Sequence, residues 1–177
     1  MKENIESIIR RTMQRTGLNL DVKEDHCGIN MTYQFIHDYV TYDSERIMQA
    51  LAEQRHPVDL DTYVTAITLH ELGHSIDREA LLASIPQSIE VLKLKQGLPV
   101  PAQYGDPNIL GILIEEDERN LVFEKTAWEN AGMLNSMHQL VRPDDFDAIA
   151  IQSLGTYEKK LADKKHQLSL LGGQAIA

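Results

Sequence analysis

The hydrophobic and polar positions of this chain follow two periods, which predict several helices and one short sheet. In the range 31–42 the two kinds of residue alternate in two short runs, because polar residues separate Met31, Tyr33 and Phe35, and Val40 and Tyr42 resume a similar pattern after residues 37 and 38. Elsewhere apolar residues recur every three to four positions, as on one face of a helix, in the ranges 3–15, 44–53, about 60–77, 87–95, 109–132 and 143–164. The chain is therefore expected to be mostly helical, with one short hairpin.

Short polar side chains, prolines and glycines indicate where these elements begin and end. Asp59 or Asp61 can accept hydrogen bonds from the first turn of the helix at about 60–77. Prolines and glycines are concentrated in the range 97–107, which predicts a loop. Pro143 can begin the final helix, which is expected to end near Lys164 and to leave a frayed tail at about 168–177.

Length and composition limit the class of protein. A chain of 177 residues with 42% hydrophobic content predicts a single domain, 1–177. No apolar run approaches the roughly 18 residues that a membrane span requires. The first 15 residues mix charges with isoleucine instead of forming the apolar block of a signal peptide. These features predict a cytoplasmic protein without a membrane partner.

Charge and cysteine content narrow the choice of partners and metals. The formal net charge is -10, which argues against nucleic acid as a partner because a protein that binds phosphates needs positive charge. Cys27 is the only cysteine, so any bound metal must be held by histidines and carboxylates. The lysines near the C-terminus are expected to form the solvated face of the last helix: Lys159, Lys160, Lys164 and Lys165.

Residues 70–74 form the pattern H-E-x-x-H inside the helix predicted at about 60–77. Residues four apart lie above one another on a helix, so His70 and His74 can bind one metal ion while Glu71 lies beside it. Zinc suits neutral imidazoles, and a catalytic zinc site keeps one position for water. Glu71 would take a proton from that water and pass it to the leaving amine, as in peptide hydrolysis. The alternative is a helix with two solvated or structural histidines.

A third zinc ligand is expected from the acidic helix predicted at 109–132. An extended motif with a third histidine is excluded, because that position is Ala80. Glu124 is the preferred ligand, since it lies on the apolar stripe of the helix, where an unpaired carboxylate is costly. Asp117 shares the stripe one heptad earlier and is the second choice. Asp77, three residues after His74, could at most orient an imidazole.

Two motifs together resemble the gluzincin metallopeptidases, in which H-E-x-x-H on one helix meets a glutamate from an E-x-x-A type motif on a second helix. The motifs are His70 to His74 and, 50 residues later, Glu124 to Trp128, and the resemblance covers roughly residues 30–135. Small size and acidic character make the chain most similar to the compact bacterial and phage peptidases of the ImmA/IrrE type. The resemblance implies an α+β, zincin-like fold, a minimal gluzincin, with a small sheet packed over the active-site helix. It also implies one Zn²⁺ ion held by both histidines and Glu124.

Further roles follow from the same resemblance. It suggests that a Tyr or His beyond the second helix stabilises the oxyanion, and His138 and Tyr157 are the available side chains. It also suggests that an edge strand beside the metal binds an extended peptide. One position departs from the family pattern: many gluzincins have Asp or Asn four residues after the ligand glutamate, bonded to a zinc-bound histidine, but residue 128 is Trp. Asp77 is a possible substitute.

The function predicted from these residues is a zinc metallopeptidase that hydrolyses an intracellular protein or peptide, with Glu71 as general base. One alternative is a noncatalytic zinc-binding module with a regulatory or protein-interaction role on the same fold. The presence of Glu71 argues against it, because a purely structural site would have a fourth protein ligand and no need for a base. A second alternative is hydrolysis of a non-peptide amide, which the same ligand set would support.

Overall fold

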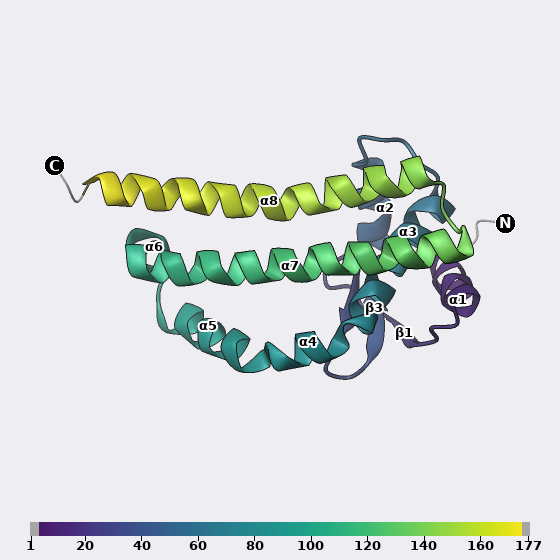
Figure 1. The fold of residues 1–177 in the computed structure, drawn as a ribbon, viewed down its shortest axis with the longest axis horizontal. Coiled ribbons are helices and arrows are strands. Elements are labelled where there is room, and N and C mark those ends of the chain that lie inside the picture. Colours follow the sequence, from purple (N-terminus) through teal and green to yellow (C-terminus); the bar gives the residue numbers. More distant parts are fainter. Residues whose placement is uncertain (1–3, 175–177) are drawn as a thin grey trace.

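The computed structural model of the protein describes residues 4–174, which form eight helices and a three-stranded sheet (Figure 1). In chain order the elements are α1 (Ile5–Thr16), β1 (Asp21–Glu24), β2 (Met31–Gln34), β3 (Tyr39–Tyr42), α2 (Ser44–Ala52), α3 (Leu60–Ile76), α4 (Arg78–Ala83), α5 (Ile85–Gly97), α6 (Val100–Gly105), α7 (Pro107–His138) and α8 (Pro143–Gln174). The predicted α+β class with mostly helical content is confirmed. Among these residues, no helix combines the length and apolar character needed to cross a membrane.

The sheet is mixed, with strand order β1-β3-β2. The hairpin predicted at 31–42 is confirmed, because β2 and β3 pair antiparallel with Tyr33 opposite Val40. Its turn contains Asp38, whose positive φ of 59° allows the chain to reverse direction. The first strand was not expected from the sequence. It pairs parallel to β3, with Val22 opposite Val40.

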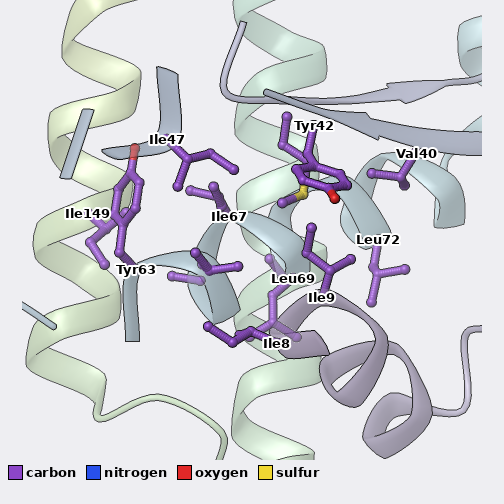
Figure 2. Packing of buried hydrophobic residues seen from close by; sticks show 14 of the residues in the cluster. Ile8, Ile9, Val40, Tyr42, Ile47, Tyr63, Ile67, Leu69, Leu72 and Ile149 are labelled. Atoms are coloured by element: carbon purple, nitrogen blue, oxygen red, sulfur yellow. The ribbon is translucent and has the colours of Figure 1, made fainter. Parts of the chain in front are cut away.

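Helix α3 lies at the centre of the molecule. The carboxylate of Asp59 accepts a hydrogen bond of 2.7 Å from the amide of Thr62, which confirms the predicted start of this helix. Buried residues run without interruption from position 63 to position 73, so the helix is covered on nearly all sides. Figure 2 shows Leu69 and Leu72 between α1 on one side and the sheet on the other. The sheet therefore packs against the helix that carries the H-E-x-x-H motif.

Helices α7 and α8 lie side by side and antiparallel, α4 and α5 lie on the other side of α7, and α6 lies beside the start of α7 (Figure 1). A second, smaller apolar cluster, formed by Leu110, Ile114 and Leu161, packs the outer part of this pair. Two predictions for this half are wrong. The range 97–107 contains the short helix α6 instead of a continuous loop, and α8 continues through 168–174, where a frayed tail was expected. Residues 1–3 and 175–177 of the predicted terminal segments lie outside the described residues.

Candidate metal centre

The two motif histidines point their Nε2 atoms at one carboxylate. The Nε2 atom of His70 lies 3.1 Å from Oε2 of Glu124, and that of His74 lies 3.5 Å from Oε1. One donor atom from each of the three residues lies within 4.8 Å of the others. The structure thus brings together the three residues that the sequence proposed as metal ligands, although Glu124 is separated from His74 by 50 residues.

The approach of α3 to α7 depends on small residues at their crossing. A Cβ atom placed on Gly73 would lie 2.1 Å from the backbone oxygen of Ala127, a distance that no side chain could adopt. The amide of Asn130 donates a hydrogen bond of 3.0 Å to the carbonyl oxygen of Gly73. Since Ala127 is one turn after Glu124, this close crossing brings the carboxylate to the histidines.

Charge and hydrogen bonds keep Glu124 ionised. Burial alone would raise its pKa, but hydrogen bonds to His70 and His74 and the charges of these imidazoles outweigh burial and lower the pKa to about 2. The pKa of His74 is raised, because the hydrogen bond to Glu124 and the charges of Glu71, Glu124 and Asp77 outweigh the opposite effect of burial. The centre therefore offers an anionic oxygen beside two imidazole nitrogens.

Glu71 lies next to the ligands in a buried position. Its side chain accepts a hydrogen bond of 2.7 Å at Oε2 from the backbone N–H of Tyr33 on strand β2. Burial raises the pKa of Glu71, with a further contribution from Glu124, and the two histidines and the Tyr33 amide oppose this shift only in part. A carboxylate with a raised pKa is a stronger base than an ordinary glutamate, so Glu71 is suited to accept a proton.

The site opens onto a cavity of about 360 Å³ between the sheet, α2, α3, α7 and α8. Its wall includes His70, Glu71 and Glu124, and also Asn30 and Met31 at the start of β2. Because β2 is an edge strand, this wall is next to a free edge of the sheet. A molecule in the cavity would therefore reach Glu71 and two of the three candidate ligands, His70 and Glu124.

The two residues proposed to stabilise an oxyanion have different positions. Tyr157 on α8 lines the cavity, and its pKa is raised by burial, by the charges of Glu124 and Glu71, and by a hydrogen bond with Glu124. His138 is the last residue of α7, and 14 residues separate it from Glu124, about 21 Å along the helix. The structure therefore keeps Tyr157 as a candidate and removes His138.

Two acidic residues considered for the site have other roles in the structure. Asp117, the second choice as ligand, is buried and pairs with Lys160 at 3.0 Å and with Lys164 at 2.6 Å. The side chain of Lys164 is only 8% exposed, so the predicted solvated lysine face is wrong at this position. Asp77 lies where α3 ends and α4 begins, and within residues 4–174 no hydrogen bond connects its carboxylate with either imidazole.

The sequence did not reveal how the ring of His70 is held. This ring stacks on Trp128, with centroids 4.5 Å apart and an angle of 28° between the planes. The rings of His70 and His74 meet edge to face, with centroids 4.7 Å apart. The Nδ1 atom of His70 is buried and has no hydrogen-bond partner among the described residues. A tryptophan four residues after the ligand glutamate was visible as a departure from the family pattern, but its contact with His70 was not predictable from spacing.

The donor set fits a zinc ion. Two imidazole nitrogens and one carboxylate oxygen are a known ligand set of catalytic zinc sites, which leave a fourth position for water or substrate. Comparisons of the chain with protein-family models, with curated proteins and with solved structures found no match. The resemblance to gluzincins therefore remains a prediction from the two motifs.

Proposed function

We propose that this protein is a zinc-dependent metallopeptidase with a zincin-like fold, which acts on a protein or peptide in the cytosol. One observation carries the proposal: donor atoms of His70, His74 and Glu124 lie within 4.8 Å of one another, beside the buried carboxylate of Glu71. These groups line or adjoin a cavity that can admit a substrate. A structural metal site would have no need of the base or of the cavity.

The chemistry is divided between the metal and Glu71. A zinc ion held by the three ligands would supply a Lewis acid that polarises the peptide carbonyl and makes water acidic enough to lose a proton near pH 7. Glu71 would take up that proton and then deliver it to the nitrogen of the leaving amine. The hydrogen bond from the Tyr33 amide fixes one oxygen of Glu71, so the second oxygen can accept the proton.

Other residues of the cavity would position the substrate. Tyr157 carries a phenol with a raised pKa, so it stays protonated. When a substrate binds, the single O–H of Tyr157 would turn from Glu124 to the carbonyl oxygen and donate a hydrogen bond as negative charge develops there. The start of β2, at an edge of the sheet that pairs with no other described strand, lines the same cavity. The Tyr33 amide of this edge is bonded to Glu71, and the remaining backbone groups can hold an extended peptide by strand addition. Both features favour a peptide substrate over a small amide.

Glu71→Gln separates a peptidase from a noncatalytic zinc-binding module. The full chain loaded with Zn²⁺ is incubated with a degenerate peptide library, cleavage is measured by mass spectrometry, and bound zinc is measured by elemental analysis. We expect the wild type to cleave peptides, and Glu71→Gln to keep its zinc but to cleave at least about 100-fold more slowly, as expected for loss of a general base. Glu118→Gln, which changes an exposed glutamate on α7, is the matched control and should cleave at the wild-type rate.

Two results would contradict the proposal. Cleavage by Glu71→Gln at the wild-type rate would exclude Glu71 as the base. A wild-type protein that binds one zinc ion but cleaves no peptide would favour the noncatalytic module.

A further inference from the structure

His70 lacks the support that a metal-binding histidine usually has. Such a histidine almost always donates its second ring N–H to a carboxylate, a carbonyl or water, and this hydrogen bond fixes the orientation of the ring. In His70 the Nε2 atom points to Glu124, so Nδ1 is the second ring nitrogen. Within residues 4–174, this buried Nδ1 has no hydrogen-bond partner. On the Nδ1 side, the ring is therefore held by packing and not by a hydrogen bond.

Trp128 packs its indole against the imidazole of His70. The two rings stack with centroids 4.5 Å apart, and Trp128 is 5% exposed. Behind it, Phe146 of α8 meets the indole edge-on at 5.4 Å, so the indole is held between two helices. Its own Nε1 has no hydrogen-bond partner in the described part of the chain, so the indole acts on His70 through its face.

We infer that Trp128 is a positioning residue of the metal centre, whose indole face holds the His70 ring with Nε2 directed at the metal, in place of a hydrogen bond at Nδ1. The inference rests on the proposed metal site but does not require peptidase activity. An imidazole that binds a divalent ion carries part of its positive charge, and the face of an indole attracts positive charge. The stacked ring would therefore stabilise the metal-loaded form of His70 in addition to restricting its rotation.

Zinc affinity of the full-length protein tests the inference. Affinity is measured by competition with a chromogenic chelator for wild type, Trp128→Phe and Trp128→Leu. We expect Trp128→Leu to bind zinc about tenfold more weakly, because it has no aromatic face, whereas Trp128→Phe should stay within about threefold of wild type. Leu134→Ala is the control, since it removes a buried side chain from the same helix, 10 residues after Glu124. Its zinc affinity should remain within about twofold of wild type even if it melts earlier.

A second measurement needs no variant. Trp128 is the only tryptophan of the chain, so its fluorescence reports directly on the stacked ring. We expect the emission to change during titration with Zn²⁺, with the same midpoint as zinc binding measured by chelator competition. This test remains decisive if Trp128→Leu fails to fold.

Three outcomes would overturn the inference: wild-type affinity in folded Trp128→Leu, an equal loss of affinity in Leu134→Ala, or zinc binding that leaves the emission unchanged. The same experiments distinguish a failure of this inference from a failure of the proposed function. Zinc binding with the expected loss in Trp128→Leu but no peptide cleavage would support the role of Trp128 while contradicting the peptidase. Peptide cleavage by the wild type with unchanged zinc affinity in Trp128→Leu would support the peptidase while contradicting the role of Trp128.

Discussion

Tyr157 and Glu124 form the part of the site in which side chains from the last two helices meet. The carboxylate of Glu124, the proposed metal ligand on α7, is close enough to the phenol of Tyr157 on α8 to raise the pKa of that phenol. Since Glu124 has a pKa of about 2, it remains a carboxylate at any pH at which the protein is expected to work. The phenol of Tyr157, with its raised pKa, remains a hydrogen-bond donor over the same range.

Tyr157→Phe tests whether this donor acts on the substrate. Loss of one oxyanion donor costs about 100-fold to 1,000-fold in kcat, so we expect a large fall in kcat and a small change in KM. Both are measured with one peptide selected from the library, together with zinc affinity. Tyr104→Phe, on the half-exposed Tyr104 of α6, is the control and should have wild-type kinetics. An unchanged kcat in Tyr157→Phe would exclude the catalytic role.

Individual site residues were predictable where a short-range pattern determined their position. The spacing of His70 and His74 on one helix is such a pattern, and it also placed Glu71 beside them. The choice between Glu124 and Asp117 could be argued only from helical periodicity, because both lie on the same stripe of α7. The structure separates them by their partners: two imidazoles for Glu124 and two lysines for Asp117.

At the scale of elements, the crossing of α3 and α7 determines whether the ligands meet. Gly73→Ala would place a methyl group against the backbone of Ala127, and neither backbone can give way without separating the helices. We expect a loss of about 3 kcal/mol in the free energy of unfolding, measured by urea denaturation, together with weaker zinc binding.

Gly111→Ala is the control for this substitution. Gly111 lies within α7, and a Cβ atom there would meet nothing within 4 Å. Alanine is a better helix former than glycine, so this variant should gain about 0.5 to 1 kcal/mol in the free energy of unfolding and should bind zinc normally. Wild-type stability in Gly73→Ala would show that the crossing is looser than the structure indicates.

The elements that were not predicted lack a local signal. Strand β1 is mostly exposed and pairs with β3, which follows it by 14 residues, so alternation of buried positions does not reveal it. Helix α6 begins next to two prolines, and prolines in the first turn of a short helix look the same as prolines in a loop. By contrast, Asp59, Pro143 and the alternating residues 31–42 gave signals that the structure confirms.

At the scale of the whole molecule, a buried ion pair joins the two longest helices. Asp117 of α7 is 5% exposed in its side chain and contacts the ammonium groups of Lys160 and Lys164 of α8. Asp117→Asn would leave the charge of buried Lys164 without a partner, and we expect a loss of about 3 kcal/mol in the free energy of unfolding. Glu118 follows Asp117 and forms an exposed ion pair with Lys165. Glu118→Gln breaks this pair and should lower the free energy of unfolding by less than about 1 kcal/mol. Equal losses in the two variants would contradict a special role for the buried pair.

The same pair predicts how acid affects stability. Burial acts to raise the pKa of Asp117, but hydrogen bonds from Lys164 and Lys160 outweigh it and hold the pKa below its ordinary value of about 3.9. The stabilisation by the Asp117 carboxylate is therefore complete above the pKa that Asp117 has in the unfolded chain. It is lost as the pH falls through the lower pKa that Asp117 has in the folded protein. We expect the difference in the free energy of unfolding between wild type and Asp117→Asn to become smaller only in strongly acidic solution. Urea denaturation at several pH values measures this difference.

The proposed ligands lie on both sides of the stretch 77–106, in which the described helices α4, α5 and α6 bury few side chains: Leu81, Val91 and Gln103. A protease that cuts this stretch would divide the chain into one piece with both histidines and another with the glutamate. The two pieces would stay associated through the contacts between α3 and α7, and a metal ion bound by ligands from both pieces would strengthen this association. Neither piece alone could hold the metal, so the centre would survive a broken backbone but not the separation of the halves.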